Sequence, residues 1–322
     1  MDGVLSRDVG AVKLLFVTVS TTVTSGSPDG AEPFDLTVLA PAKVNLVLRV
    51  LGRRADGYHD LETLMLPVSL CDQVEMRVTR AAETHISCEV LGDPTIGGGP
   101  DNLACRAASS LLDATGVKAR VEIRLTKKVP HGAGLGGGSS DAAAVLKGIT
   151  RLLGLDRAKR SLYALAASLG ADVPFFLPCR PSWATGVGER LEPVPGFPSL
   201  NLVVVMPAVT VPTAWAYREA LGSLTSRQAK ISFPRLSFAD ATLGRGFHND
   251  FELGVARAYP DVARIREILD TQGARATVLS GSGAAMVGLF DDESRAKAAA
   301  ADFQAPDRAW AVKILRGPPR AR

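Results

Sequence analysis

The feature that most constrains this chain is a glycine-rich stretch, Pro130–Asp141 (PHGAGLGGGSSD), in which five of the seven residues from 132 to 138 are glycine. Glycine loses more conformational freedom on folding than any other residue, so such a run needs a physical reason. Without Cβ atoms, the backbone can approach a ligand closely and direct N–H groups at it. The following helix adds unpaired N–H groups and the positive end of its dipole. The stretch therefore predicts a polyphosphate site, where Ser139 and Ser140 cap the helix or bind a phosphate or Mg²⁺.

Other interpretations fit this stretch less well. A flexible linker would not run directly into an amphipathic helix. A Walker A motif is excluded because no Gly-Lys-Ser/Thr occurs in the chain. Gly132, Gly134 and Gly137 satisfy GxGxxG, but a dinucleotide fold also needs a strand that follows the helix and ends in an acid. Here Gly154, Asp156 and another helical segment follow instead, so hydride transfer is disfavoured.

Length, charge and cysteine content limit the class of protein. A chain of 322 residues fits two packed domains, because single cores stop growing near about 250–300 residues. The net charge of +4 and the lack of a long basic run argue against a nucleic-acid partner. The adjacent Lys127 and Lys128 are expected on a solvated face. Without CxxC spacing, the cysteines are expected to be small, buried, free thiols in a reducing, cytoplasmic setting. They are Cys71, Cys88, Cys105 and Cys179.

The N-terminal residues 1–33 are expected to be an extension or the product of a start codon placed too early. Leu14–Val19 is apolar, but it is far shorter than the roughly 20 residues that a membrane helix needs. The charged residues around it do not resemble a signal peptide, and Ser25–Pro33 is linker-like. No membrane partner is predicted.

Periodicity predicts strands and helices in mixed runs, which indicates an α+β fold rather than strict βαβ alternation. Pro193–Ser199 (PVPGFPS) is expected to be a domain junction. The expected strands are 36–51, 73–79, 121–126, 202–206, two short strands that flank 280–283, and 309–315; the expected helices are 101–112, 139–153, 157–169, 213–222, 260–272 and 292–302.

Three polar residues stand in apolar surroundings. Lys43 and Asn45 are two apart in an extended segment, so both side chains leave one face while Val44 and Leu46 take the other. This pattern suits the wall of a cleft; the alternative is an exposed edge lysine. Asp172 has small or apolar neighbours, and an acid in that setting is either partnered or functional. The alternative for Asp172 is a turn or capping aspartate.

These motifs occur together in one known family. PHGAGLGGGSSDAA resembles the second signature motif of the GHMP kinases, while Pro41–Leu46 (PAKVNL) and Leu279–Gly283 (LSGSG) are similar to two further motifs in the expected order. Arg54–Thr63 (RADGYHDLET) and Gly170–Phe176 (GADVPFF) resemble the diphosphocytidyl-methylerythritol kinases among them. The resemblance covers roughly residues 36–316.

The resemblance implies a fold and an activity. It implies an N-terminal domain of the ribosomal-protein-S5 type, a ferredoxin-like C-terminal domain, and an active site in the cleft between them. We expect the domains at 34–192 and 193–316, followed by a tail at 317–322. The implied reaction is ATP-dependent phosphorylation of the 2-hydroxyl of a cytidine-diphosphate-linked methylerythritol, with Mg²⁺ as the counter-ion of ATP. The implied partner is a small molecule, and the chain is expected to be a monomer or weak homodimer.

The resemblance also implies roles for individual residues. Asp172 is the base that takes the proton of the substrate hydroxyl, and Lys43 keeps it ionised and stabilises the transferring group. Tyr58 stacks on cytosine, His59 hydrogen-bonds its edge, and Tyr217 closes the sandwich, with Trp215 as a rival. The residues expected to bind the nucleotide are Pro130, His131, Gly132, Ala133, Gly134, Leu135, Gly136, Gly137, Gly138, Ser139 and Ser140; those expected to bind the substrate are Asn45, Tyr58, His59, Thr213, Tyr217, Ser280 and Gly281.

Two alternatives stay open. In the first alternative, the chain is another GHMP kinase, of the homoserine or mevalonate-pathway type. In the second, it is a non-catalytic nucleotide- or RNA-binding protein on an S5-like fold. The low net charge argues against RNA. One departure from the family concerns Arg180–Ala184 (RPSWA), which replaces a Gly-Gly-x-Ala segment before Thr185–Glu189 (TGVGE). The Asn249–Glu252 stretch is expected to be mainly structural.

Overall fold

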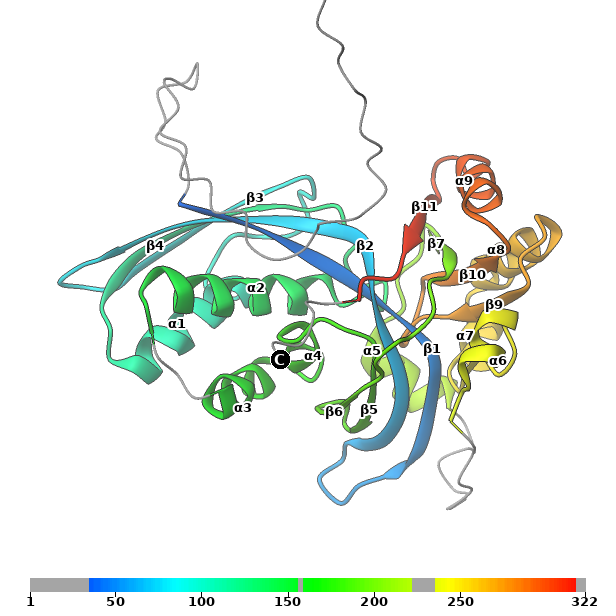
Figure 1. Cartoon of the computed structure of the whole chain (residues 1–322), viewed down its shortest axis with the longest axis horizontal. Coiled ribbons are helices and arrows are strands. Elements are labelled where there is room, and N and C mark those ends of the chain that lie inside the picture. The colour runs from blue at the N-terminus through cyan, green and yellow to red at the C-terminus, as the bar shows by residue number, and fades with distance from the viewer. Residues whose placement is uncertain (1–34, 156–158, 222–234, 317–322) are drawn as a thin grey trace, which may run out of the picture.

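The structure is a computed structural model that describes residues 35–155, 159–221 and 235–316. The predicted N-terminal extension, the predicted tail at 317–322 and the ends of the helices expected at 157–169 and 213–222 lie outside the described residues. Within them, two sheets and their helices lie side by side (Figure 1). The α+β class predicted from the sequence is confirmed.

The first sheet has seven strands in the order β3-β4-β2-β1-β8, with β5 paired to β2 and β6 paired to β5. Its centre is a long antiparallel hairpin of β1 (Leu36–Arg53) and β2 (His59–Arg80), which contains two of the predicted strands. The remaining strands are β3 (His85–Leu91), β4 (Ala119–Thr126), β5 (Ser182–Gly186), β6 (Arg190–Pro193) and β8 (His248–Asn249).

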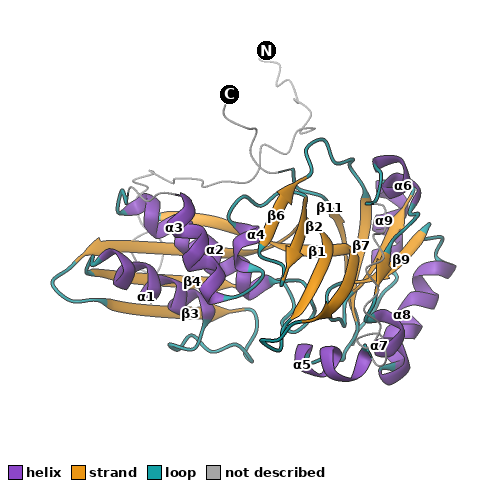
Figure 2. Ribbon diagram, turned by 90° about the horizontal axis from the view of Figure 1, so that it is seen from below, coloured by secondary structure: helices purple, strands orange, loops and turns teal. Residues whose placement is uncertain are grey.

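Helices cover one face of this sheet (Figures 1 and 2). α2 buries the apolar stripe that its sequence predicted, and it begins at Gly137, two residues earlier than expected. The reason is local: Gly136 adopts a left-handed conformation, with φ of 70°, and turns the chain into the helix without a side-chain cap. The helices here are α1 (Leu103–Thr115), α2 (Gly137–Leu152), α3 (Lys159–Leu169) and α4 (Val173–Phe176).

The second sheet is antiparallel, with strand order β11-β7-β10-β9. With its two long helices the chain order is β7-α8-β9-β10-α9-β11, which is the βαββαβ arrangement of a ferredoxin-like fold. This confirms the predicted C-terminal architecture. The elements are β7 (Asn201–Met206), α8 (Pro260–Thr271), β9 (Ala276–Leu279), β10 (Met286–Phe290), α9 (Glu293–Ala301) and β11 (Arg308–Lys313).

Shorter helices connect the two sheets. The helix expected at 213–222 is a short α-helix, α5 (Thr213–Trp215), that continues as a π-helix, η1 (Ala216–Ala220). The sequence did not predict α6 (Phe238–Leu243) or α7 (Glu252–Ala258), because both are short and carry little helical periodicity.

The core crosses the expected domain junction at 193. Leu46 and Leu66 of the long hairpin belong to the same apolar cluster as Val204 and Met286 of the second sheet. After β7 of the second sheet, the chain also returns to the first sheet. There β8 pairs in parallel with β1 at Val47 and Leu48. The hairpin therefore belongs to both halves of the molecule and fixes them relative to one another.

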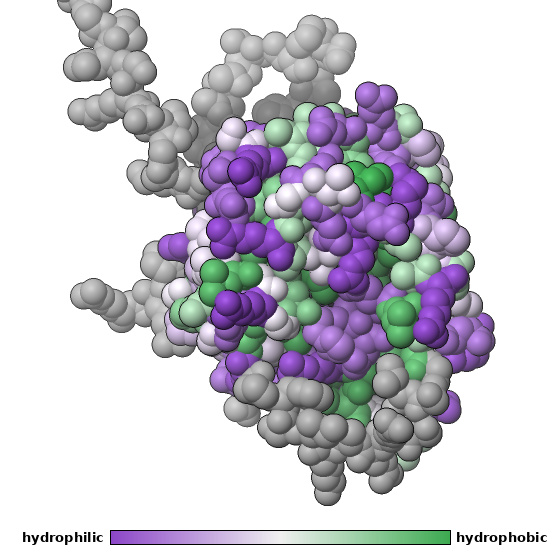
Figure 3. Space-filling model, turned by 90° about the vertical axis from the view of Figure 1, so that its right-hand side faces the viewer, coloured by the Kyte–Doolittle hydropathy of each residue, from purple (hydrophilic) through white to green (hydrophobic). Residues whose placement is uncertain are grey.

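The surface over the C-terminal helices is mostly hydrophilic, with apolar side chains scattered among polar ones (Figure 3). Among the described residues, none of the helices has the length and apolar character needed to cross a bilayer. All four cysteines are free, as expected, although only Cys105 and Cys179 are fully buried.

We predict that Gly254→Ala destabilises the fold at the contact between α7 and η1. A Cβ at Gly254 would lie 2.2 Å from the carbonyl oxygen and 2.6 Å from the Cα of Ala220. Because both are backbone atoms, the helices must separate, and the free energy of unfolding should fall by about 1–3 kcal/mol in urea denaturation. Gly52→Ala is the control, since no atom lies within 4 Å of its added Cβ. An equal loss in both variants would contradict the prediction.

Candidate active site

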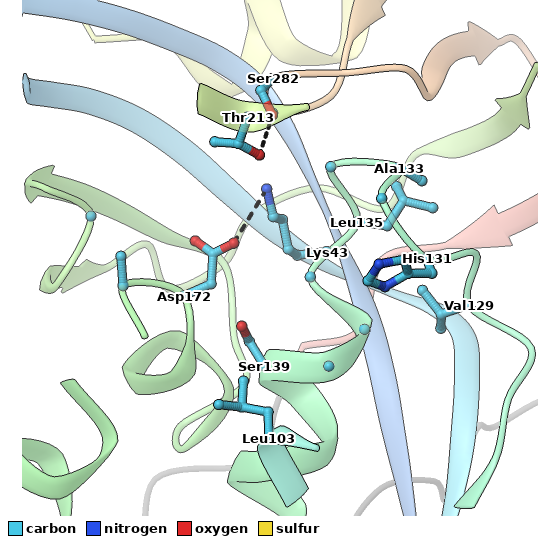
Figure 4. A pocket seen from close by; sticks show the side chains of 18 of the residues that line it. Lys43, Leu103, Val129, His131, Ala133, Leu135, Ser139, Asp172, Thr213 and Ser282 are labelled. Carbon is cyan, nitrogen blue, oxygen red and sulfur yellow. Dashed lines mark hydrogen bonds and ion pairs between the residues drawn. The ribbon is translucent and has the colours of Figure 1, made fainter. Parts of the chain in front are cut away.

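A cavity of about 1230 Å³ opens where the two halves of the molecule meet. Its walls come from segments that are far apart in the sequence: the middle of β1, residues 57–59 where β2 begins, the glycine stretch and the turn at 281–282. Figure 4 shows part of this wall, with Lys43, Asp172 and Ser139 around the same opening. The segments that the sequence singled out are thus brought together in one place.

The glycine stretch lines the cavity from Pro130 to Ser139. Gly132, Gly134 and Gly136 have φ of 67°, 73° and 70°, a backbone region that other residues rarely adopt. The first N–H groups of α2 have no partner within the helix, and no side chain caps them. The arrangement is that of an anion site made of backbone.

Glycine is also required here by close packing. A Cβ at Gly134 would lie 2.3 Å from the carbonyl oxygen of Ser280, and one at Gly136 would lie 3.0 Å from the Phe176 ring. The backbone N–H of Lys43 donates to the carbonyl of Leu135 at 2.9 Å. The glycine stretch is therefore held against β1, α4 and the turn after β9.

Two serines predicted at the site lie behind its wall. Ser140 is 2 % exposed, does not line the cavity, and its hydroxyl has no hydrogen-bond partner among the described residues. It points inward because the helix rotates it by about 100° from Ser139, which does line the cavity. Ser280 is fully buried; its hydroxyl accepts from the Asn45 N–H at 3.3 Å and donates to the Gly134 carbonyl at 3.4 Å.

Lys43 and Asp172 converge at the centre of the cavity (Figure 4). The ammonium of Lys43 lies 3.8 Å from the Asp172 carboxylate and donates to Asn45 Oδ1 at 2.6 Å. Asn45 in turn donates to Thr63 Oγ1 at 2.7 Å. Lys43 is only 4 % exposed, so it is not the exposed edge lysine of the alternative interpretation. Lys43 and Asn45 share a face of β1, as predicted.

Asp172 precedes α4 but does not cap it. It occupies the N-cap position, yet its side chain forms no capping hydrogen bond, and 36 % of that side chain is exposed to the cavity. A carboxylate beside an ammonium and open to a cavity can accept a proton from a bound hydroxyl.

The turn after β9 lies above this pair. Gly281 and Ser282 line the cavity, and the Ser282 hydroxyl hydrogen-bonds that of Thr213 at 3.1 Å (Figure 4). Asn249 holds the turn in place, because its amide donates to the carbonyls of Leu279 and Gly281 at 2.7 and 2.8 Å. This agrees with a structural role for the stretch that contains Asn249. Ser282, which the sequence did not single out, replaces Ser280 on the cavity wall.

Aromatic side chains form another part of the cavity wall, which we refer to as the aromatic end. Tyr58 is 65 % exposed, and the rings of His59 and Tyr217 lie 5.1 Å apart. Tyr217 rests edge-on against Phe251, with ring centres 4.8 Å apart. Trp215 does not line the cavity and packs on Tyr259 instead. The geometry therefore favours Tyr217 over Trp215 at this wall.

The charge states at this end are set mainly by burial. Burial and, secondly, the positive charge of Arg53 lower the pKa of His59, so its neutral imidazole is favoured. Burial raises the pKa of Tyr217 to about 12, so its phenol stays protonated at neutral pH. A neutral ring pair beside an exposed tyrosine suits an uncharged aromatic ligand.

Sequence reasoning missed several residues of the wall. The segment at 96–103 lines the cavity, whereas the sequence predicts only a helix that begins at 101. Asn102 does cap α1, by accepting from the Ala104 N–H at 2.9 Å. Val187 and Gly188 also line the cavity, whereas the departing segment Arg180–Ala184 does not. That departure from the family therefore stays outside the cavity.

Lys127 corrects another expectation. The Lys127–Lys128 pair was expected on a solvated face, but Lys127 is 8 % exposed and binds Asp72 and Asp141. Lys127 and Asp141 both line the cavity. The burial of Lys127 could not be predicted from its neighbour Lys128, because Asp72 and Asp141 are distant from Lys127 in the sequence. Among the described residues, no group of three or more His, Cys, Asp or Glu side chains is arranged to hold a metal ion.

Comparison with known proteins gives one consistent family. Residues 102–179 match the model of the GHMP kinases N terminal domain, and residues 237–308 match the GHMP kinases C terminal model. The 4-diphosphocytidyl-2-C-methyl-D-erythritol kinase of Geobacter sp. strain M21 is 42% identical over 281 residues, which are 87% of this chain and 98% of that protein. The kinase of the same name from Solibacter usitatus is 44% identical over 79% of this chain and 81% of its own.

Solved structures agree with these matches. A crystal structure of 4-(cytidine 5'-diphospho)-2C-methyl-D-erythritol kinase is 39% identical, superposes with a TM-score of 0.73, and is covered over 100% of its chain and 88% of this one. Homoserine kinase from Cytophaga hutchinsonii is 20% identical with a TM-score of 0.60, over 87% of this chain and 94% of that one. The second likeness shows a common fold alone.

We predict that Gly134→Ala weakens binding of a non-hydrolysable ATP analogue by about tenfold or more. The added Cβ would meet the Ser280 carbonyl at 2.3 Å and would also strain a residue with positive φ. Titration calorimetry measures the affinity. Gly273→Ala is the matched control, since Gly273 has φ of 88° but no atom within 4 Å of the added Cβ. Analogue binding at wild-type affinity in Gly134→Ala would disprove the packing argument.

Proposed function

Since this chain belongs to the GHMP kinases, and among them to the 4-diphosphocytidyl-2-C-methyl-D-erythritol kinase family, we propose that it phosphorylates that substrate. The reaction transfers the γ-phosphate of ATP to the 2-hydroxyl of 4-diphosphocytidyl-2-C-methyl-D-erythritol and gives the 2-phosphate and ADP. This reaction is a step in the non-mevalonate pathway of isoprenoid-precursor synthesis. The observation that carries the proposal is the Lys43–Asp172 pair beside the glycine stretch, 3.8 Å apart.

Asp172 is the proposed base. Its carboxylate takes the proton of the 2-hydroxyl while that oxygen attacks the γ-phosphorus. The bond from the γ-phosphorus to the oxygen that bridges it to the β-phosphate breaks, and ADP leaves with that electron pair. Lys43, buried and fixed by Asn45, places a positive charge where negative charge spreads over the transferring group.

The glycine stretch is the proposed phosphate site. Its backbone and the first turn of α2 offer N–H groups to the β- and γ-phosphates, and Ser139 adds a hydroxyl at the same wall. Mg²⁺ would enter as the counter-ion of ATP rather than as an ion held by the protein alone. When bound, the ion neutralises part of the phosphate charge. The Ser139 hydroxyl, which lines the cavity, would supply an oxygen ligand of the kind that Mg²⁺ prefers.

The aromatic end is the proposed cytosine site. Tyr58 and Tyr217 would stack on the ring, and the neutral His59 would hydrogen-bond its edge, a role that the 5.1 Å between the His59 and Tyr217 rings supports. Between the two ends, Asn45, Thr213 and Gly281 line the part of the cavity that the methylerythritol would occupy. A monomer or weak homodimer in the cytoplasm remains a prediction from sequence.

We predict that purified protein forms ADP with 4-diphosphocytidyl-2-C-methyl-D-erythritol and ATP, but not with homoserine or mevalonate. The reason is the aromatic end, which has a ring-binding wall that neither small substrate would use. A coupled ADP assay across the three substrates measures the preference. Turnover with homoserine or mevalonate alone would reject the proposed substrate.

We predict that Asp172→Asn lowers kcat by about 100-fold or more, because the amide cannot accept the proton. Affinity for the ATP analogue should stay near the wild-type value, since Asp172 lies outside the glycine stretch. Coupled assay and calorimetry give the two values. Unchanged kcat would remove Asp172 as the base, and a parallel loss of nucleotide affinity would indicate a binding role instead.

A further inference from the structure

A buried cluster of charges lies next to the glycine stretch, and the proposed reaction does not use it. The ammonium of Lys127 lies 2.5 Å from Asp72 Oδ2 and 2.5 Å from Asp141 Oδ2. Lys127 is 8 % exposed, Asp72 is 0 % exposed and Asp141 is 3 % exposed. We refer to Asp72, Lys127 and Asp141 as the buried triad.

The triad joins the two ends of the glycine stretch. Lys127 follows β4 at the start of the stretch, and Asp141 lies in the first turns of α2 at its end. Asp72 lies in β2 and accepts the N–H groups of Lys128 and Val129 at 2.5 and 2.8 Å through its second oxygen. The Asp72 carboxylate thus binds the backbone that leads into the glycine stretch. Lys127 links this carboxylate to Asp141 in α2, where the stretch ends.

The packing at the base of the stretch is close. A Cβ at Gly137 would lie 3.0 Å from the Val129 side chain and 3.3 Å from Asp72 Oδ2. The start of α2 therefore packs against the Asp72 carboxylate and against Val129, whose N–H donates to that carboxylate. The residues between these two ends, 130–136, form the phosphate wall of the cavity.

Stability alone is a poor explanation for the triad. Burying charges is costly, and well-packed apolar residues in place of a buried ion cluster are often as stable or more stable. Here two carboxylates share one ammonium, and Asp141 Oδ1 is buried without a hydrogen-bond partner among the described residues. Burial, which the Lys127 charge only partly offsets, raises the pKa of the Asp141 carboxyl above its usual range. A costly cluster at this place points to a role in positioning.

We propose that Asp72, Lys127 and Asp141 are positioning residues that set the distance between the two ends of the glycine stretch and so preorganise its backbone for the phosphates of ATP. The proposal rests on the proposed kinase function, because ATP is the ligand of that wall. The contribution is to nucleotide affinity, since misplacing a preorganised contact by about 1 Å can cost up to about 100-fold.

The test compares Asp141→Leu with Asp141→Asn. Asparagine keeps an oxygen that accepts from Lys127, whereas leucine has a similar size and no acceptor. We expect Asp141→Leu to raise KM for ATP about tenfold or more, with KM for the cytidine substrate within about twofold of wild type. Asp141→Asn should stay within about threefold of wild type for both substrates.

Asp72 separates positioning from direct contact, because it does not line the cavity. Asp72→Leu should raise KM for ATP in the same direction as Asp141→Leu. Where Asp72→Leu does not fold, Lys127→Met, which keeps the aliphatic stem, is compared by hydrogen exchange without nucleotide, because Lys127 lines the cavity and its KM for ATP alone would not separate positioning from contact. Hydrogen exchange of residues 128–138 without nucleotide should be faster than wild type in each leucine or methionine variant, and near wild type in Asp141→Asn.

The control removes a similar acid elsewhere. Asp307 is 9 % exposed, accepts from Arg264 at 2.7 Å, and has one buried oxygen without a partner among the described residues. Asp307→Leu should lower the melting temperature without changing KM for ATP or the exchange of residues 128–138.

Each outcome is decisive. Wild-type exchange and wild-type KM for ATP in Asp141→Leu and Lys127→Met would overturn the proposal, as would Asp141→Asn that is as impaired as Asp141→Leu. An increase in KM for ATP in the Asp307→Leu control would also overturn it. If the wild-type protein turns over none of the substrates, the proposed function fails, while exchange of residues 128–138 still tests the triad independently.

Discussion

The site depends on the close approach of the glycine stretch to the backbone on either side of it. On one side Leu135 accepts the N–H of Lys43, and on the other a Cβ at Gly134 would overlap the Ser280 carbonyl. This contact places the phosphate wall, the buried lysine and the turn after β9 within one cavity. Any side chain at Gly134 would separate these parts, so the requirement for glycine is geometric as well as entropic.

The long hairpin of β1 and β2 extends this constraint to the whole molecule. Its middle carries Lys43 and Asn45 at the cavity, and the apolar residues of the same part, among them Leu46 and Leu66, pack in the same core as the ferredoxin-like sheet. The two halves are therefore joined by a shared core as well as by the chain that connects β6 to β7. A cavity between two packed sheets keeps Asp172 and Lys43 opposed because their supporting strands and helices cannot slide freely.

Sequence patterns predicted what is local or periodic. The glycine stretch, the α2 stripe, the strands on both sides of Ser280–Gly283 and the shared face of Lys43 and Asn45 all follow from short-range rules. The patterns did not predict contacts between distant segments. Lys127 was misassigned because Asp72 and Asp141, which bury it, lie 55 and 14 residues away. Ser280 and Ser140 were misplaced because which side of a turn or helix faces the cavity is decided by packing.

The two ends of the cavity are built in different ways, and this bears on specificity. The proposed phosphate end is made of backbone, so its shape depends on glycine and on the packing of the residues around it. The aromatic end is made of side chains: Tyr58 lies in a loop, His59 is the first residue of β2, and Tyr217 lies in a short π-helix. Side chains on such elements can be exchanged without altering the sheet or the phosphate wall. Under the proposed function, the choice of acceptor would therefore depend on side chains at the aromatic end, while the backbone of the glycine stretch stays the same.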